Sequence, residues 1–461
     1  MARTSSLSGF PEWLPDGRIV ENHVLDTLRH TFELHGFAPI ETRSVEPVEQ
    51  LLAKGETSKE IYLLSRLQAD AEGTDDDARA DGGTGAGGPD RRLGLHFDLT
   101  VPFARWVVEH AGDLAFPFRR YQIQKVWRGE RPQDGRFREF TQADVDIVGD
   151  GTLAEHHEAE LALVMAEAIA ALPVPPARVR VNNRKLSQGF YAGIGLTDVD
   201  AVLRAIDKLD KIGPDAVARL LQDEAGASEQ QAEQALALAA IRGTAHEVED
   251  SVRGLGVRTD LLEEGLDSLI GVLSAAERRR PDAVVGDLSI ARGLDYYTGT
   301  VYETTLLGHE DLGSICSGGR YDSLASAGNR TFPGAGLSIG VSRLVARILG
   351  ADLARASRPV PSAVLVAVAD EAHRSTSDDV AAALRARDIP VEVAPSAAKF
   401  GKQIRHADRR SIPFVWFVGD DGHEVKDIRS GGQVPADPAT WEPPAADRWP
   451  SVSATAVEDG S

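Results

Sequence analysis

The sequence predicts an α+β protein in which an antiparallel sheet forms the main domain and a smaller α/β domain follows. Three observations lead to this class. Two strand-like segments, RYQIQKVWRGE and REFTQADVDIVG, flank the polar loop RPQDGRF, which is the pattern of a long antiparallel hairpin. Residues from about 197 to 280 read as successive amphipathic helices with almost no strand pattern. From Ser362 onward, strands and helices alternate, as they do in a compact α/β domain.

The other elements of the main domain follow from the spacing of apolar residues. From Ile19 to Phe32 these residues recur at helical spacing, and the chain then turns at Gly36 into the expected strand FAPIETRSVEP. The segment LGLHFDLTVPFARWVV reads as a strand, a break at Pro102 and a helix. After the hairpin we expect a helix over 155–172 and the alternating strand RVRVNN. Strand patterns return in SIARGLDYYTGTVYETTL and GAGLSIGVSRL, on either side of the glycine-rich turn SGGRYDSL.

These patterns divide the chain into a main domain over 1–356, an α/β domain over 357–434 and a tail over 435–461. The tail is rich in Pro, Ala and Asp, and we expect it to be mobile. Within the main domain, residues 69–92 are acidic and rich in Gly. That composition cannot bury a core, so the sequence predicts a disordered surface insert there.

Composition limits the class of protein. Apolar residues make up 42% and charged residues 26% of the 461, as in ordinary soluble globular proteins. No apolar stretch approaches the ~20 residues needed to span a bilayer, and the first 15 residues lack a signal-peptide pattern. The single Cys316 excludes an internal disulfide and a cysteine-built zinc site. We therefore expect a cytoplasmic protein.

The hairpin is the first candidate for chemistry. The formal charge of −21 disfavours nonspecific binding to nucleic acid, yet residues 119–138 hold seven Lys or Arg against two acids. Arg128 and Glu130 alternate on one strand, so both point to the same face. A guanidinium there can hold a phosphate through two charge-assisted bonds, and the carboxylate can accept from an exocyclic amine. An exposed cross-strand ladder of ion pairs explains the same pattern without a ligand.

Four further peptides show that the chain resembles the histidyl-tRNA synthetase family. The strand–R-x-E–loop–strand pattern is similar to motif 2 of class II aminoacyl-tRNA synthetases. ARGLDYYTGTVYE and SICSGGRYD resemble the two signature peptides of the family, GAGLSIGVSRL resembles class II motif 3, and HFDLTVPFAR resembles its substrate loop. The match runs in the family's order over roughly 10–430. It implies a mainly antiparallel catalytic sheet of six or seven strands with a helical insertion, followed by an anticodon-binding domain.

The resemblance implies a histidine–tRNA ligase. ATP activates histidine to histidyl-adenylate and pyrophosphate, and histidine is then transferred to the terminal ribose of its tRNA. The attacking carboxylate is already ionised at neutral pH, so catalysis rests on alignment and on charge stabilisation at the α-phosphate. The matching arginines, taken as catalytic, are Arg128, Arg292 and Arg343. In the ATP site, Glu130 would accept from the adenine amine and Phe140 would stack on the ring. Mg²⁺ would accompany ATP.

Histidine recognition needs partners for the imidazole nitrogens and for the α-amino group, because such partners remain unpaired with a wrong amino acid. The positions that match the family's histidine site are Asp98, Leu99, Thr100, Arg128, Gln142, Asp146, Arg292, Tyr296 and Tyr297.

Two basic segments are the candidates for tRNA contact. In the motif 2 loop, Gln133, Arg136 and Arg138 could meet the acceptor end of the tRNA. The segment KFGKQIRHADRR carries five Lys or Arg against one Asp in the anticodon-like domain, where Lys399, Lys402 and Gln403 are the candidates. A solvated charged face would look the same.

Two alternatives stay open. A noncatalytic relative such as the regulatory subunit of ATP phosphoribosyltransferase shares the catalytic fold but lacks the anticodon domain. An RNA-binding module would keep the basic loop and lose the ATP arginines. The resemblance also implies a homodimer, although Arg43 stands where the family's motif 1 usually has a proline.

Overall fold

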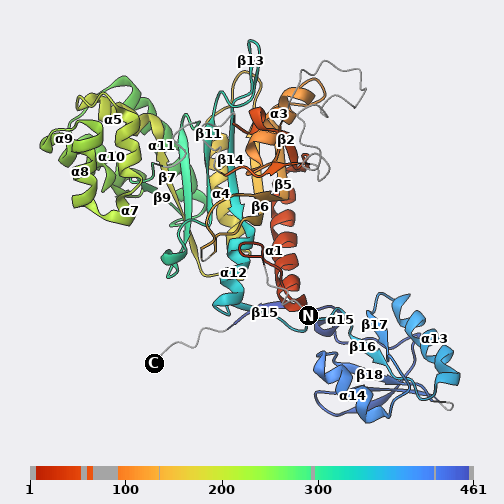
Figure 1. Cartoon of the computed structure of the whole chain (residues 1–461). Coiled ribbons are helices and arrows are strands. Elements are labelled where there is room, and N and C mark those ends of the chain that lie inside the picture. Colours follow the sequence, from red (N-terminus) through yellow and green to blue (C-terminus); the bar gives the residue numbers. More distant parts are fainter. Residues whose placement is uncertain are drawn as a thin grey trace, which may run out of the picture. The chain divides into compact units, whose positions relative to one another are not determined.

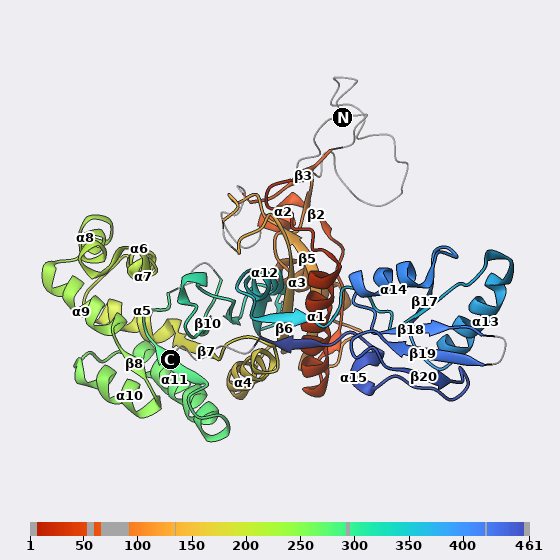
Figure 2. The ribbon, with the colours of Figure 1, turned by 90° about the horizontal axis from the view of Figure 1, so that it is seen from below.

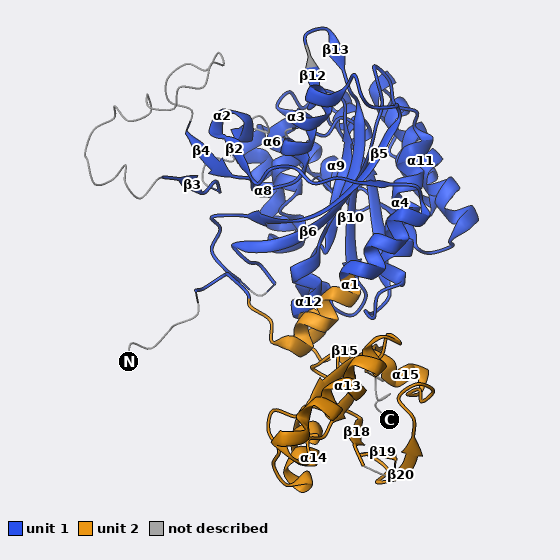
Figure 3. Ribbon diagram, turned by 90° about the vertical axis from the view of Figure 1, so that its right-hand side faces the viewer, with its two compact units in different colours: residues 1–11, 25–346 blue, residues 12–24, 347–461 orange. Residues whose placement is uncertain are grey.

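The computed structural model describes residues 7–52, 60–65, 92–133, 135–291, 296–419 and 422–455. The predicted insert at 69–92 lies outside these ranges except for its last residue, which is exposed. The chain forms two compact units, which Figure 3 shows in separate colours: 1–11 with 25–346, and 12–24 with 347–461. The division therefore comes ten residues before the boundary predicted at 356.

A nine-stranded sheet forms the body of the first unit (Figure 1). Its strands, in spatial order, are β1 (Ala38–Pro39), β5 (Phe118–Trp127), β6 (Glu139–Val148), β14 (Gly334–Gly340), β11 (Cys316–Tyr321), β10 (Thr300–Leu306), β7 (Ala177–Asn183), β9 (Val284–Asp287) and β8 (Arg242–Gly243). Only the β1–β5 and β7–β9 pairs are parallel. The mainly antiparallel sheet is confirmed. It has more strands than expected, in part because the two-residue β8 is too short to leave a sequence pattern. The strand expected over FAPIETRSVEP is divided: its first part forms β1 of this sheet, and its last part forms a strand of a separate small sheet.

The two faces of the sheet differ in what covers them. Helices α4 (His156–Ala170) and α11 (Asp260–Arg279) pack on one face. On β5, Arg119 forms an ion pair with Glu160 of α4, with a nitrogen–oxygen distance of 2.8 Å. Because side chains alternate along a strand, Arg120 points to the opposite face, and the neighbouring strand β6 places Gln142 and Asp144 there. That opposite face is polar.

The expected helical insertion is present as α6 (Val199–Ile206), α7 (Leu209–Ile212), α8 (Pro214–Ala225), α9 (Glu229–Ala239), α10 (Ala245–Gly254) and α11. Four of these helices, α6, α9, α10 and α11, begin at side chains that accept hydrogen bonds from backbone N–H groups of the first turn. Ser228 with Gln231 and Thr244 with Glu247 form complete capping boxes at α9 and α10. The insertion lies beside the β7–β9 edge of the sheet, where α11 packs on both strands (Figures 1 and 2).

The first unit contains further helices and strands, two of which continue into the second unit. They are α1 (Pro15–Leu34), α2 (Val48–Leu51), α3 (Thr100–His110), α5 (Arg184–Gly193), α12 (Val341–Gly350), the small sheet of β2 (Val45–Pro47), β4 (Leu93–Leu95) and β3 (Leu63–Leu64), the 3-10 helix η3 (Glu310–Leu312), and the hairpin of β12 (Ser326–Ala327) and β13 (Arg330–Thr331). None of the helices within the described ranges is long and apolar enough to cross a membrane.

The second unit contains a five-stranded sheet with helices packed on it. The strand order is β17 (Val391–Val393), β16 (Val364–Val366), β18 (Phe414–Phe417), β19 (His423–Asp427) and β20 (Gln433–Ala436). Alternate residues face opposite sides, so Val364 and Trp416 join one buried cluster and Leu365 and Val415 another. The helices are η4 (Glu371–His373), α13 (Arg374–Arg385), α14 (Phe400–Arg409) and α15 (Ala445–Arg448).

The prediction of a mobile tail is wrong for residues 435–455. Trp441 packs against the rings of Phe414 and Trp416, with centroids 5.4 and 5.5 Å away. Arg387 donates to the carbonyl oxygen of Trp441 at 2.6 Å. The strands β15 (Ala354–Ala356) and β21 (Val452–Ala454) then pair with each other. Aromatic burial by a single Trp thus anchors a segment whose average composition resembles a disordered one. Residues 456–461 lie outside the described ranges.

Candidate active site

A cavity of about 740 Å³ opens on the polar face of the first unit's sheet. Its walls come from the β5–β6 hairpin and its loop, from β14, β11 and α12, and from the segments before α3 and β10. Ten of the predicted residues line it: Asp98, Thr100, Arg128, Glu130, Arg136, Phe140, Gln142, Tyr296, Tyr297 and Arg343. Tertiary folding therefore brings together predicted residues as distant in the sequence as Asp98 and Arg343, which are 245 residues apart.

Arg128 is held from several sides at the end of β5. Its Nε donates to the Phe97 carbonyl oxygen at 2.9 Å, and its Nη2 lies 3.4 Å from Gln142 Oε1. The guanidinium carbon lies 5.1 Å from the centre of the Phe140 ring. Glu130 is 3.8 Å away. Because these contacts fix the side chain while leaving it 30% exposed to the cavity, its charge is oriented before any ligand arrives.

Arg343 lies in the first turn of α12, directly after β14. Its Nη1 donates to the Ser314 carbonyl oxygen at 2.8 Å, and its Nη2 donates to the Leu312 carbonyl oxygen. The hairpin loop crosses over it at Gly135, whose φ is +65°. A Cβ at Gly135 would lie 3.0 Å from Arg343 Cγ, so glycine suits both the backbone angle and the close approach.

One end of the cavity is bordered by Asp98, Thr100, Gln142, Tyr296 and Tyr297. We call it the carboxylate end, because buried acids lie around it. The two tyrosine rings have centroids 4.1 Å apart, and burial raises the pKa of Tyr296. Asp98 Oδ1 accepts from the Val101 backbone N–H at 3.2 Å, at the start of α3. Buried acids around this end favour a ligand that carries a cationic group or several N–H donors.

Two of the predicted histidine-site residues do not line the cavity. The Leu99 side chain is fully buried in the core. Asp146 is 3% exposed, forms an ion pair with Arg120 at 2.7 Å, and accepts from the Tyr321 hydroxyl at 2.8 Å. A Cβ at Gly336 would lie 2.0 Å from Asp146 Oδ1, which explains one glycine of the GAGLSIG segment. The four-residue spacing from Gln142 correctly places Asp146 on the same face but not at the cavity.

The candidates for tRNA contact also differ in their surroundings. Gln133 and Arg136 form a backbone bridge across the hairpin loop, and Arg138 Nε donates to the Glu130 carbonyl oxygen at 3.1 Å. In the second unit, Lys399 and Lys402 are exposed.

Gln403 is a poor candidate for a tRNA contact, because its side chain is 3% exposed. Its amide bonds to the Val368 backbone N–H at 3.0 Å and to the Val368 carbonyl oxygen at 2.8 Å. Its position on α14 therefore points it into the core of the second unit. Arg292 lies outside the described residues.

The cavity also has wall residues that were not among the candidates, although one of them, Ser338, lies within the peptide GAGLSIGVSRL. Ser338 of β14 and Glu60 line it, and burial raises the pKa of Glu60. Arg204 and Asp207 reach it from α6 and the turn after that helix. Helical periodicity could not have identified Arg204, since a charged residue on an amphipathic helix normally faces solvent.

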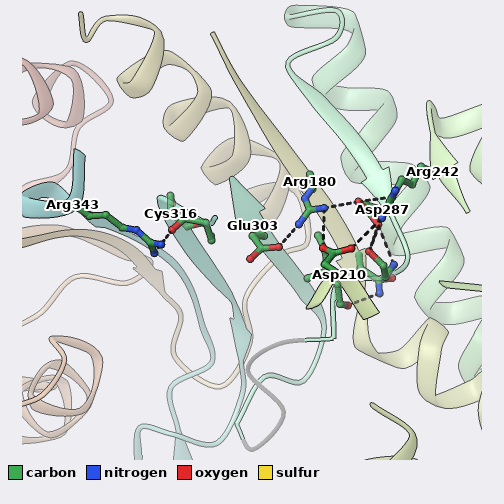
Figure 4. A network of polar contacts seen from close by, with 11 residues as sticks. Arg180, Asp210, Arg242, Asp287, Glu303, Cys316 and Arg343 are labelled. Atoms are coloured by element: carbon green, nitrogen blue, oxygen red, sulfur yellow. Dashed lines mark hydrogen bonds and ion pairs between the residues drawn. The ribbon is translucent and has the colours of Figure 1, made fainter. Parts of the chain in front are cut away.

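A network of ion pairs joins the sheet to the insertion near this wall (Figure 4). Arg180 of β7 pairs with Asp287 of β9 at 3.0 Å and with Glu303 of β10. Arg242 also pairs with Asp287, at 2.9 Å, and Asp210 of α7 lies within 3.8 Å of both arginines. Glu303 pairs in register with Ser317 of β11, which lines the cavity. The network thus ties the insertion to the strands of the site.

Comparisons with known proteins identify the family to which the sequence and the fold are similar. The family model described as histidyl-tRNA synthetase matches residues 86–344, and the anticodon binding domain model matches 362–434. Histidine–tRNA ligase of Micrococcus luteus is 64% identical over 460 residues, covering 98% of this chain and 99% of its own. That of Cutibacterium acnes is 59% identical over 465 residues, covering 99% and 100%. A crystal structure of histidyl-tRNA synthetase from Nostoc sp. PCC 7120 is 34% identical, covers 95% and 97%, and has a TM-score of 0.81.

Proposed function

The chain belongs to the histidyl-tRNA synthetase family, and from that premise we propose how its side chains divide the work of a histidine–tRNA ligase. The enzyme activates histidine with ATP and transfers it to its tRNA. The observation that carries the residue assignments is the single cavity in which Arg128, Arg343, Phe140 and Gln142 meet. The anticodon-binding domain over 362–434 favours the ligase over the regulatory subunit considered from the sequence.

In the activation step, Arg128 acts on the α-phosphate and Arg343 on the far end of ATP. The attacking group is a carboxylate, which is ionised at neutral pH, so the protein need not remove a proton. The oriented guanidinium of Arg128 can stabilise the charge that develops on the α-phosphate. Arg292, which lies outside the described residues, is assigned beside the reacting carboxylate by family similarity.

The base of ATP is placed between the ring of Phe140 and the carboxylate of Glu130. Both residues line the cavity within reach of Arg128, at 5.1 and 3.8 Å respectively. Glu130 also lies 3.6 Å from Arg136 of the loop. Mg²⁺ enters with ATP as the counter-ion of its phosphates, so it belongs to the substrate.

Histidine is placed at the carboxylate end of the cavity. Asp98 and Thr100 hold its α-amino group, Gln142 accepts from one of its N–H groups, and Tyr296 and Tyr297 border the imidazole. Asp146 acts indirectly, because its ion pair with Arg120 leaves no side-chain surface at the cavity. The Leu99 side chain is not assigned to substrate.

Contacts with tRNA are assigned to two exposed basic segments. Gln133, Arg136 and Arg138 of the hairpin loop meet the acceptor end, and Lys399 and Lys402 of the second unit meet the anticodon arm. We place the enzyme in the cytoplasm, where tRNA is charged, and propose that it acts as a homodimer like other members of its family. Light scattering on the purified protein would test the dimer.

The experiment that tests the function is ATP–pyrophosphate exchange with each of the twenty amino acids. Exchange with histidine alone, followed by charging of histidine tRNA, is the expected result. Histidine binding without any exchange would indicate a sensor built on the same fold, and the arginine assignments would fall.

A further inference from the structure

A chain of hydrogen bonds runs behind the carboxylate end of the cavity, from Asp144 through Ser338 to Gln142. Ser338 Oγ donates to Asp144 Oδ1, and Gln142 Nε2 donates to Ser338 Oγ. The other end of the same amide, Gln142 Oε1, lies 3.4 Å from Arg128 Nη2. Gln142 and Ser338 line the cavity, whereas Asp144 is 2% exposed and lies behind them.

The chemistry of these groups fixes the direction of each bond. An ionised carboxylate can only accept, and a serine hydroxyl has a single hydrogen to donate. Ser338 must therefore donate to Asp144, and its oxygen must accept from the amide nitrogen of Gln142. The amide oxygen of Gln142 then faces Arg128, which can only donate, and the cavity. While Asp144 is ionised, Gln142 presents an acceptor to the ligand.

Protonation of Asp144 removes this constraint. A protonated carboxyl can donate to Ser338, whose hydrogen is then available to the amide oxygen of Gln142. The amide can turn so that its nitrogen faces the guanidinium of Arg128. Two donors would then face each other, and the cavity would have lost its acceptor.

The surroundings of Asp144 bring this change into the physiological range. Burial raises the pKa of Asp144 to about 7, although Arg120 acts to lower it. The charged and titratable groups that face it come from several elements: Arg120 on β5, Asp146 on β6, Cys316 on β11, Asp98 before α3 and Tyr296 before β10.

We propose that Asp144 is a positioning residue for histidine: when ionised, it holds Gln142 through Ser338 with the amide oxygen toward an N–H group of the substrate. When protonated, it releases that amide. This inference rests on the proposed function, since histidine supplies the N–H donor. None of the motifs singled out Asp144, because an Asp in a strand that also contains Asp146 looks like one more polar position.

The test compares wild type with Asp144→Asn in histidine-dependent ATP–pyrophosphate exchange. Asparagine has the shape of the protonated acid and donates permanently through its amide. The quantity is the ratio of kcat/KM for histidine, wild type over variant, from about pH 5.5 to about pH 8.5, a range that brackets the pKa of Asp144. The imidazole of the substrate titrates identically with both proteins and cancels in this ratio.

Above pH 8 the expected ratio is about ten, and the difference between the two proteins should lie mainly in KM. A misdirected buried hydrogen bond weakens binding by about that factor. It should fall toward one at the acidic end. Ser338→Ala breaks the same chain of hydrogen bonds without changing a charge, so its ratio should depend on pH in the same way. This variant replaces Asp144→Asn in the test if Asp144→Asn does not fold. Asp150→Asn is the matched control, since Asp150 is exposed and pairs only with Arg330 among the contacts described. Its ratio should stay at one.

A ratio that does not change with pH, whatever its size, overturns the inference, because a merely structural loss would not follow the titration of Asp144. Wild type that shows no exchange with histidine at any pH overturns the proposed function itself, and the inference with it. Exchange by wild type together with a flat ratio overturns the inference alone.

Discussion

Replacing Arg120 by Met should cost far more stability than the same change at its neighbour Arg119. The Arg120 guanidinium is fully buried and pairs at 2.7 Å with Asp146, whose side chain is 4% exposed. Arg119 makes an ion pair of nearly the same length, 2.8 Å, but it and Glu160 are 22% and 29% exposed. Sequence neighbours thus offer one chemical change in two environments on opposite faces of β5.

The magnitudes follow from burial. Removing one partner of a buried ion pair costs about 3–5 kcal/mol, because it leaves an uncompensated charge away from water. Here that charge is Asp146, with Asp144 on the same face two residues away. Loss of a partly exposed pair costs about 1 kcal/mol or less. Arg120→Met should therefore exceed Arg119→Met by at least about 2 kcal/mol.

The loss should also depend on pH. Burial raises the pKa of Asp144 from 3.8 to about 7, and Arg120 opposes that rise, so its removal moves the pKa still higher. The folded state then binds a proton that the unfolded state releases at lower pH. Stability therefore falls as pH rises from about 4 through the folded pKa. Arg120→Met should be most destabilising above pH 7 and less so near pH 5.5.

Hydrogen exchange followed by mass spectrometry on peptides from β5 and β6 measures the opening free energy of this region, and it does not require the whole chain to unfold in one step. Adding Asp146→Asn to Arg120→Met should recover part of the loss, because it removes the charge left unpaired. Equal losses for the Arg120 and Arg119 variants would refute the reasoning, as would a double variant no more stable than Arg120→Met.

Three further predictions concern the site and the second unit. Arg128→Ala should lower histidine-dependent exchange about 10²–10³-fold, while circular dichroism shows that the fold is retained. Arg136→Ala should instead slow tRNA charging more than exchange. Equal effects of Arg136→Ala on both steps would contradict its place in the tRNA site. Gln403→Ala should destabilise the second unit by about 1–3 kcal/mol, because it leaves buried backbone groups without hydrogen-bond partners. Lys402→Ala should leave stability unchanged and reduce the salt dependence of tRNA binding. A stable Gln403 variant with weak tRNA binding would reverse these roles. Burial raises the pKa of the Cys316 thiol, so iodoacetamide should modify it only after denaturation, and rapid labelling of the native enzyme would contradict this.

The sequence by itself determined the classes of structure and most members of the site. The apolar patterns predicted the strands of the hairpin and the helices of the insertion, because strand and helix periods are local properties of the chain. The long ordered motifs placed Arg128, Phe140 and Arg343 in one site before any geometry was known.

Only the tertiary structure decided which polar residues face the cavity and which form ion pairs and hydrogen bonds with other buried residues. Asp146 and Gln142 lie on the same face of the sheet. Arg120 and Tyr321 bind the carboxylate of Asp146, whereas Gln142 lines the cavity. Gln403 looked like part of a basic surface and is instead bonded to the Val368 backbone. Periodicity gives the direction in which a side chain points. It does not give the residue that this side chain contacts, because that residue comes from an element far away in the sequence.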